Sequence, residues 1–183
     1  MDRLIRTPAG LAFLALALVI LFSSTVSFVP ETRQGVVVRF GQPVRIINDA
    51  AMQAVGSYKG GRMLFLGLGT GLGSCLIVDH HVVPTELAHM PYRKDRTFED
   101  YVGLRGLKRL GKKRWRGHVE KVCGILFDAL LPDEIVIGGG NVKNLKRLPE
   151  HCRAGDNANA FEGGFRLWAK EWADAVPVYN DGK

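Results

Sequence analysis

The sequence predicts an α/β fold preceded by one transmembrane helix. Two runs rich in apolar residues, Arg62–Gly67 and Ser74–Asp79, flank a glycine-rich turn and are typical of a β-hairpin. A long helical segment, a third apolar strand and a final helical segment follow them. Strands that are followed by a helix, a strand and a helix indicate an α/β or α+β domain. An uncharged stretch near the N-terminus predicts the transmembrane helix.

The composition is that of one domain of ordinary size. The chain has 183 residues, of which 46% are hydrophobic and 23% charged, so it is neither disordered nor built on disulfides. The three cysteines, Cys75, Cys123 and Cys152, lie far apart in the chain and form no CxxC or CxC motif. We therefore expect reduced, buried thiols rather than disulfides or zinc ligands.

The N-terminal stretch Ala9–Val29 contains no charged residue. At about 1.5 Å per residue, a helix of this length crosses a hydrocarbon core of about 30 Å. A cleaved signal peptide is the main alternative, but the apolar block is long for one and no Ala-x-Ala site follows it. A buried globular helix would need a polar face, which this stretch lacks. Arg3 and Arg6 favour a cytoplasmic N-terminus, against which three later basic residues compete, namely Arg33, Arg39 and Arg45.

Strands, turns and one short helix are predicted for the first part of the remaining chain. A β-branched run predicts a strand over Gly35–Gly41. Asn48 is placed to cap a helix over Asp49–Val55, which Gly56 would end. After the hairpin, Asp79-His80-His81 predicts a turn into a further extended run.

Helices are predicted for most of the second half. Residues Phe98–Lys113 predict a helix with breaks at glycine. Trp115–Leu131 predicts a longer helix, in which apolar residues recur at helical spacing. Glu134–Gly140 predicts a buried strand that runs into a glycine turn, and Asp156 is placed to cap a last helix over Ala158–Trp172.

The turn Gly67–Gly73 has the pattern Gly-x-Gly-x-Gly-x-Gly. It joins two strands rather than a strand and a helix, so it is not a dinucleotide-binding fingerprint. Glycines in such a turn let successive backbone N–H groups approach a phosphate without interference from Cβ atoms, and Thr70 adds a hydroxyl donor. A plain tight hairpin would contain the same glycines, so the turn alone leaves both interpretations open.

Three polar side chains complete a candidate site. Asp49 lies at the start of a predicted helix, where the helix dipole favours a carboxylate. Next to a phosphate-binding turn, the same carboxylate could take the proton of an attacking sugar hydroxyl. Glu86 and His89 could hydrogen-bond vicinal hydroxyls, although such a pair is also common on surface turns. The order of these motifs suggests a pocket for a polyol and a phosphate.

This order of motifs resembles the C-terminal half of ROK-family sugar kinases, including those of the polyphosphate-glucokinase type, over residues 47–172. Asn48-Asp49-Ala50-Ala51 is similar to the family's catalytic segment, and Gly69-Thr70-Gly71-Leu72-Gly73 is similar to its second phosphate motif. Glu86-Leu87-Ala88-His89 is similar to its Glu-x-Gly-His sugar motif, with alanine in place of the glycine. Gly138-Gly139-Gly140 is similar to its adenosine-side turn.

The resemblance implies half of an actin-like (ribonuclease-H-like) ATPase fold. ATP or polyphosphate with Mg²⁺ would be the donor and a glucose-like sugar the acceptor. No zinc is expected, because the family's closely spaced cysteines are missing. The family's first phosphate loop, Asp-x-Gly-Gly-Thr, does not occur either, so we expect weak or no activity from this chain alone. The implied roles are general base for Asp49, sugar contacts for Asn48, Glu86 and His89, phosphate contacts for Gly69, Thr70 and Gly71, and nucleotide contacts for Gly138, Gly139 and Gly140.

A second resemblance concerns the N-terminus. Met1–Arg45 is similar to the start of HflC-type members of the band-7 (stomatin/prohibitin) family, on the residues Val29-Pro30-Glu31-Thr32 and Val36–Arg45. It implies a single-pass protein of the bacterial inner membrane that modulates a membrane protease, so the alternative function is that of a membrane-anchored interaction protein. Together the two resemblances suggest an anchor over 1–30, a linker over 31–46, a kinase-like lobe over 47–175 and a tail over 176–183.

Most of the net charge of +7 comes from one basic run. A solvated helix face is the simplest interpretation. An anion site is the functional alternative, for polyphosphate or for acidic lipid headgroups; nucleic acid fits less well, because Trp115 is the single aromatic residue in the run. A homodimer is also expected, since half of a kinase would expose apolar surface. The basic residues are Arg105, Lys108, Arg109, Lys112, Lys113, Arg114, Arg116 and Lys121.

Overall fold

The computed structural model describes residues 44–45, 47–175 and 178–179. The chain divides into two units, 1–37 and 38–183, and all described residues belong to the second. The predicted transmembrane helix over Ala9–Val29 and the predicted strand over Gly35–Gly41 lie outside the described residues. Among the helices that the structure describes, none is long and apolar enough to cross a membrane.

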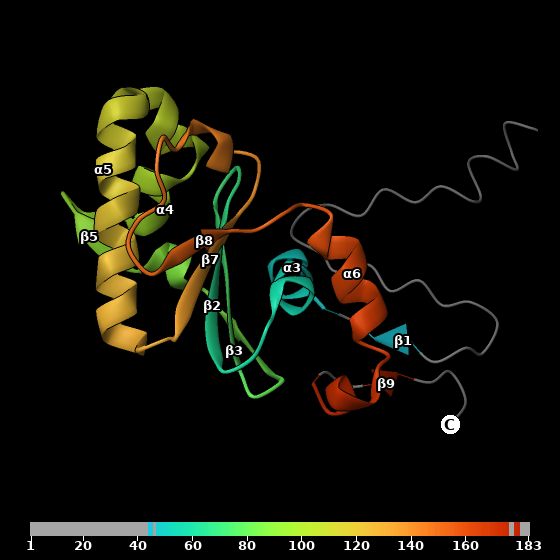
Figure 1. Ribbon diagram of the computed structural model, residues 1–183. Helices are drawn as coiled ribbons and strands as arrows, with labels where there is room; N and C mark the ends of the chain where they lie inside the picture. Colours follow the sequence, from blue (N-terminus) through green and yellow to red (C-terminus); the bar gives the residue numbers. More distant parts are fainter. Residues whose placement is uncertain (1–43, 46, 176–177, 180–183) are drawn as a thin grey trace, which may run out of the picture. The chain divides into compact units, whose positions relative to one another are not determined.

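A five-stranded mixed sheet lies at the centre of the described residues (Figure 1). Its strand order is β4-β3-β2-β7-β8, in which β4, β3 and β2 are antiparallel neighbours and β2, β7 and β8 run parallel. The predicted hairpin is confirmed as β2 and β3, and the fold is mixed α/β, as the order of elements predicted. The strands are β2 (Arg62–Leu68), β3 (Leu72–Val78), β4 (His81–Thr85), β7 (Glu134–Gly138) and β8 (Cys152–Ala154).

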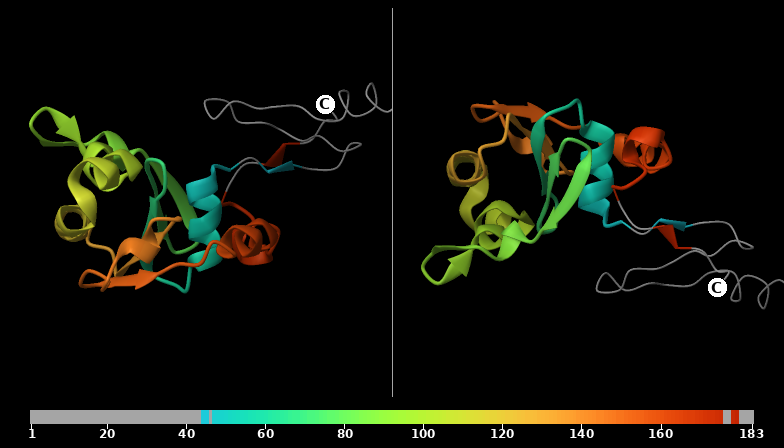
Figure 2. Two further views of the ribbon diagram at one scale, coloured as in Figure 1. Left: turned by 90° about the horizontal axis from the view of Figure 1, so that it is seen from above. Right: turned by 90° about the horizontal axis from the view of Figure 1, so that it is seen from below.

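Helices cover both faces of this sheet, as Figure 1 and Figure 2 show. The helices α4 and α5 lie on one face; α3 lies on the other, and α6 packs on the side of α3 that points away from the sheet. The helices are α3 (Asp49–Ser57), α4 (Phe98–Val102), α5 (Leu104–Leu130) and α6 (Asn159–Arg166), with 3-10 helices over Leu87–His89, Val142–Asn144 and Lys170–Trp172. Two small antiparallel pairs are separate from the main sheet, β1 (Val44–Arg45) with β9 (Val178–Tyr179) and β5 (Pro91–Arg93) with β6 (Arg96–Thr97).

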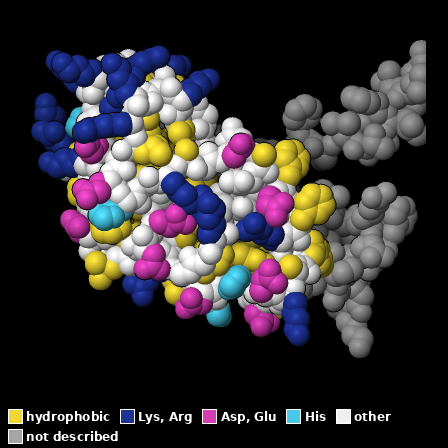
Figure 3. All heavy atoms as spheres, viewed as in Figure 1, with side chains coloured by type: hydrophobic (Ala, Val, Ile, Leu, Met, Phe, Trp, Pro, Cys, Tyr) yellow, Lys and Arg dark blue, Asp and Glu magenta, His cyan; other side chains and the backbone are white. Residues whose placement is uncertain are grey.

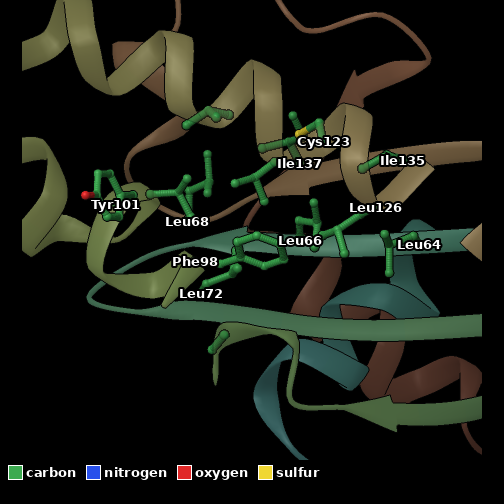
Figure 4. Close-up of a cluster of buried hydrophobic side chains, with 14 of the residues drawn as sticks. Leu64, Leu66, Leu68, Leu72, Phe98, Tyr101, Cys123, Leu126, Ile135 and Ile137 are labelled. Atoms are coloured by element: carbon green, nitrogen blue, oxygen red, sulfur yellow. The ribbon is translucent and has the colours of Figure 1, made fainter. Parts of the chain in front are cut away.

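The core between α5 and the sheet explains why the second half of α5 is helical. Trp115, Val119, Val122 and Leu126 recur every three or four residues, and all are buried. They meet inward-facing residues of β2 and β7 in one apolar cluster, part of which is drawn in Figure 4. Burial of each large apolar side chain contributes about 1.5–3 kcal/mol.

Glycines bring α3 and α6 together on the other face. Several alanines of α3 are buried in a second apolar cluster with residues of β2 and β3. A Cβ atom on Gly163 would overlap with the carbonyl oxygen of Met52, and a Cβ atom on Gly56 would overlap with that of Asn159. The two helices can therefore approach this closely only because both positions lack a side chain.

The predicted breaks at Gly103 and Gly111 are confirmed, whereas Gly106 lies inside α5 without a break. Gly103 separates α4 from α5, and Gly111, with φ of 72° and ψ of 159°, bends α5. Gly56 does not end α3 as predicted, since the helix continues to Ser57. The reason is the contact with α6, which requires a glycine inside the helix at this point.

The last helix is shorter than predicted. It ends at Arg166 rather than at Trp172, although Asp156 still hydrogen-bonds the backbone just before its first turn. Beyond Arg166 the chain tightens, because Ala169 N–H donates to the carbonyl three residues earlier at 2.9 Å. This turn returns Trp172 to the core, where it is buried against Tyr58.

Two of the three cysteines lie together, which their spacing in the chain did not predict. Cys123 of α5 is buried and Cys152 of β8 is half-buried, and both side chains belong to the same apolar cluster. Cys75 of β3 is buried on the α3 side of the sheet. The expectation of full burial is therefore wrong for Cys152.

Candidate active site

The two predicted ligand-binding glycine turns leave the sheet at the same edge. The parallel strands β2 and β7 pair with Gly67 opposite Gly138. Residues 69–71 and 139–140 therefore follow the carboxyl ends of neighbouring parallel strands. In open α/β sheets this edge is where ligands commonly bind.

Asn141 connects one glycine turn to the other. Its side-chain Nδ2 donates to Gly69 O at 2.8 Å, and its backbone N–H donates to Leu68 O at 3.0 Å. Gly139 has φ of 87°, and a Cβ atom there would lie 2.6 Å from Leu68 O, so only glycine lets this turn lie so close to β2. The predicted phosphate turn and the predicted nucleotide turn are thus in direct contact.

Two backbone amides at the tip of the first turn are free to bind an anion. Gly69 N–H is used within the turn, where it donates to Gly71 O at 3.2 Å. Among the described residues, no hydrogen-bond acceptor meets the N–H of Thr70 or of Gly71. Leu72 N–H faces the Glu99 carboxylate at 3.4 Å. Thr70 and Gly71, rather than Gly69, therefore offer the pair of successive amides that an anionic oxygen needs.

The first turn of α3 places Asp49 beside this hairpin. A Cβ atom on Gly73 would lie 3.0 Å from Ala50 Cβ, so the backbone of β3 passes directly against the helix start. Asn48 caps the helix by accepting the Ala51 N–H at 2.6 Å, and Asp49 Oδ1 accepts the Ala50 N–H at 2.8 Å. The Asp49 residue is exposed. One carboxylate oxygen is therefore held at the positive end of the helix, and the other is open to a ligand.

Glu86 and His89 follow on the next stretch of chain, which Ser74 ties to the same hairpin. Ser74 Oγ donates to Thr85 O at 2.9 Å and accepts the Leu87 N–H at 3.2 Å. The side chains of Glu86 and His89 are 79% and 73% exposed, with Oε2 and Nε2 3.9 Å apart. Both are therefore free to contact a polyol.

Gln53 is a polar residue at this edge that sequence patterns did not single out. It lies one turn after Asp49 on the same side of α3. Its Oε1 is buried and has no hydrogen-bond partner among the described residues. A Cβ atom on Gly138 would lie 3.4 Å from this oxygen, so α3 directs a free acceptor at the start of the second glycine turn. The one sequence signal that could have identified Gln53 is its spacing of four residues from Asp49.

The described residues contain no metal-binding cluster, and the surface hollow on α5 is lined by residues other than those of the candidate site. No group of three or more His, Cys, Asp and Glu side chains is placed to hold a metal ion in the described part of the chain. A surface hollow of ≈ 220 Å³ lies along α5, lined by Arg116, Glu120 and residues 145–149. The candidate site is therefore defined by a carboxylate, two amides and a Glu/His pair, a set suited to positioning a hydroxyl against a phosphate.

The fold is mixed α/β and resembles that of solved sugar-kinase domains with actin-like architecture. No family model matches the chain, and the comparison with curated proteins finds no match. The inorganic polyphosphate/ATP-glucomannokinase of Arthrobacter sp. strain KM shares the fold, with a TM-score of 0.52 and 24% identity over 63% of this chain and 51% of that one. A ROK family protein from Streptococcus pneumoniae TIGR4, solved with sucrose, has a TM-score of 0.55 and 12% identity over 68% and 66% of the two chains.

A third solved structure agrees with these two. The ROK hexokinase of Thermus thermophilus has a TM-score of 0.50 and 15% identity, and the match covers 63% of this chain and 62% of that one. At sequence identities of 12% to 24%, the similarity between these structures shows a shared fold and does not extend to function. The chain spans about half to two thirds of the length of these three solved proteins.

Proposed function

We propose that the described unit is a lobe of a sugar kinase that transfers a phosphoryl group from ATP or polyphosphate to a hydroxyl of a glucose-like sugar. The observation that carries the proposal is that the start of α3 at Ala50, the Thr70–Gly71 amides, unpaired among the described residues, and the Glu86–His89 stretch all adjoin the β2–β3 hairpin. The names of the similar structures support it, since one is a polyphosphate/ATP-glucomannokinase and another binds sucrose.

Each group has one task in this proposal. The Glu86–His89 stretch binds sugar hydroxyls together with Asn48 Nδ2, because Asn48 Oδ1 is used by the helix cap. Asp49 takes the proton of the reacting hydroxyl, whose oxygen attacks the terminal phosphorus of the donor. The bond between that phosphorus and the rest of the donor breaks, while the amides of Thr70 and Gly71 stabilise the transferred oxygens.

The turn over residues 138–140 is proposed for the adenosine side of a nucleotide donor. No atom lies within 4 Å of a Cβ atom built on Gly140, so its backbone borders open space. The buried Oε1 of Gln53 lies beside this turn and has no hydrogen-bond partner among the described residues. Because the described residues form no metal cluster, Mg²⁺ would be held mainly by the donor's phosphate oxygens and by water.

Formation of glucose 6-phosphate tests the proposal. The full chain, purified in detergent, is incubated with glucose and with either ATP and Mg²⁺ or polyphosphate. We expect weak product formation, because the chain covers only part of the length of the kinases that it resembles. Asp49→Asn keeps the size of the side chain but removes the base, so it should lower the rate by about 100-fold or more.

Glucose binding gives a second measurement that does not depend on turnover. Isothermal titration calorimetry should show about tenfold weaker binding for Glu86→Gln, since a hydrogen bond to a charged acceptor contributes about 1.5–3 kcal/mol. The control is Glu150→Gln, because Glu150 forms a comparable exposed pair with His151, 3.6 Å apart, on a different part of the surface. Absence of glucose binding, together with product no higher than in Asp49→Asn, would rule the proposal out.

The N-terminal residues support a second candidate function. The uncharged stretch over 9–29 and the similarity of Val29–Arg45 to HflC-type proteins favour an interaction protein anchored in the bacterial inner membrane, next to a membrane protease. Cell fractionation and co-purification test this candidate. Recovery in the membrane fraction together with a protease supports it, whereas a protein found in the soluble fraction with no such partner contradicts it.

A further inference from the structure

We propose that α5 binds a linear inorganic polyphosphate chain along its basic segment, and that this surface continues the phosphate site of the Thr70–Gly71 turn. The inference deepens the proposed function and rests on it, because the end of the chain would be the phosphoryl donor. We define the basic segment as the six exposed side chains of Arg105, Lys108, Arg109, Lys112, Lys113 and Arg114.

The positive charge of this segment is not neutralised by nearby acids. Residues 104–119 contain no Asp or Glu. Among the described residues five ion pairs form, and none includes a member of the basic segment. Figure 3 shows the Lys and Arg side chains gathered near the top of the view, over the upper part of α5. Such a cluster attracts polyanions rather than single small anions.

A histidine that follows the basic segment on α5 lies near two further positive charges. The pKa of His118, one turn beyond the segment on α5, is lowered by burial and then by the charges of Arg93 and Lys121. A bound polyanion would offset this repulsion. Further positive charge therefore lies beyond the basic segment, at Arg93 of β5 and Lys121 of α5.

The basic helix begins at the phosphate turn itself. Leu104, the first residue of α5, donates its N–H to Thr70 O at 3.1 Å. A Cβ atom on Gly103 would lie 3.0 Å from Thr70 O and 3.3 Å from Gly71 Cα, so the helix start packs directly on the turn. Arg105, one residue into the helix, therefore follows directly on the segment that packs on the turn. A phosphate chain held at the turn would pass the Glu99 carboxylate, which faces Leu72 N–H at 3.4 Å, before it reaches Arg105.

Trp115 and Tyr101, which lie next to the segment, are buried and cannot stack on bases, which favours polyphosphate over nucleic acid. Trp115 is 0% exposed, and its Nε1 donates to Val102 O at 2.8 Å. Tyr101 is buried, and the Arg109 guanidinium lies 5.0 Å from the centre of its ring. Single-stranded nucleic acid is normally held by exposed aromatic rings as well as by charge. A chain of phosphates without bases needs only the cations.

Binding of polyphosphate to the full chain tests the inference without any sugar or turnover. Fluorescence anisotropy is measured with end-labelled long-chain polyphosphate, and tripolyphosphate is added as a competitor. The long chain should bind more tightly than tripolyphosphate. Six contacts at about 0.7 each predict a slope of about −4 for log affinity against log salt.

Two double variants provide a matched comparison, because one removes two charges from the basic segment and the other removes two charges elsewhere. Lys112→Gln/Lys113→Gln should weaken binding and change the salt slope to about −3, since two contacts are lost. Lys59→Gln/Lys170→Gln removes the same charge from exposed positions elsewhere and should leave affinity and slope nearly unchanged. Equal effects of the two double variants would overturn the inference. Tighter binding of a single-stranded DNA of equal charge would also overturn it, in favour of a nucleic-acid site.

The outcomes separate this inference from the proposed function. If the long chain binds through the basic segment but no sugar is phosphorylated, the surface is confirmed and the kinase proposal fails. If sugar is phosphorylated but tripolyphosphate binds as well as the long chain, the kinase proposal stands and the extended surface is refuted.

Discussion

Gly139 and Gly140 are adjacent in the turn after β7 but have different surroundings. Gly139 has φ of 87° and lies against the Leu68 carbonyl, whereas Gly140 borders open space. Gly139→Ala should lower the free energy of unfolding by about 1–3 kcal/mol, because alanine is strained in this backbone conformation. Gly140→Ala should raise it by about 0.4–1 kcal/mol, by restricting the unfolded chain. Urea denaturation measures both values, and equal effects would contradict the geometry of this turn.

Cys152 should ionise at lower pH than an ordinary thiol. A hydrogen bond from Cys123 lowers the pKa of Cys152 and outweighs the opposing effect of burial. The same hydrogen bond and burial raise the pKa of Cys123, and burial raises the pKa of Cys75 to about 12. Since the thiolate is the reactive form, Cys152 should be the first of the three to be alkylated by iodoacetamide as the pH rises.

Peptide mass spectrometry over a pH series checks this order. Cys123→Ala removes the donor, so the pKa of Cys152 should rise and its alkylation should move to higher pH. Cys123→Ser keeps a donor and should preserve most of the effect. A Cys152 profile that is the same in wild type and Cys123→Ala would show that the hydrogen bond does not control its ionisation.

Local patterns predicted some residues of the candidate site and missed others for a physical reason. The capping position of Asn48 and the place of Asp49 in the first helical turn depend on neighbours within four residues, so the sequence predicted them. Asn141 owes its position to a hydrogen bond with Gly69, 72 residues away, and Gln53 to the packing of α3 beside β7. The sequence near Asn141 does not distinguish it from any other polar residue.

At the scale of elements, the contact between α3 and α6 depends on Gly163. A Cβ atom there would overlap with Met52 O, whereas one on Gly164 would meet only the Met52 sulfur, at 3.8 Å. Gly163→Ala should lower the free energy of unfolding by about 1–3 kcal/mol, because the helices must separate. Gly164→Ala should raise it by about 0.5–1 kcal/mol through helix propensity. If thermal unfolding finds both variants as stable as wild type, α6 does not pack on α3 in this way.

Elements with a clear internal period were predicted, and those that depend on distant contacts were not. The hairpin β2–β3 and the second half of α5 follow from alternation and helical spacing within the segment itself. The early end of α6 depends on Trp172, which turns back to pack against Tyr58 and is 2% exposed. The strand β8 has three residues and exists because it pairs with β7. The end of α6 and the presence of β8 therefore cannot be predicted from the residues of these two elements alone.

At the scale of the whole molecule, the sugar-kinase resemblance predicted the fold better than composition or periodicity could. Alternating strands and helices left α/β and α+β folds both possible. The order of four short motifs predicted half of an actin-like sugar-kinase fold, and the solved structures of similar fold agree with a mixed α/β domain that resembles it. The roles of the motif residues and the membrane anchor over 9–29 stay predictions, because fold similarity at this level of identity does not determine either.

A large apolar surface on α6 leads to a prediction about assembly. Phe161 and Phe165 are each 77% exposed, and Trp168, just after the helix, is 52% exposed. The two phenylalanines are four positions apart in the sequence, so both lie on the same side of α6. Exposed aromatic side chains that adjoin in this way mark surfaces that bind another chain. We therefore expect the protein to self-associate through this face of α6.

Sedimentation velocity in detergent over a concentration series tests this expectation while keeping the apolar N-terminal stretch in solution. Phe161→Ser/Phe165→Ser should weaken association by about tenfold or more, since each buried phenylalanine would contribute about 1.5–3 kcal/mol. Val83→Ser is the control, because Val83 is 44% exposed on β4, in a different layer. A protein that is monomeric at every concentration, or a double variant that associates as strongly as the control, would show that α6 is not the contact surface.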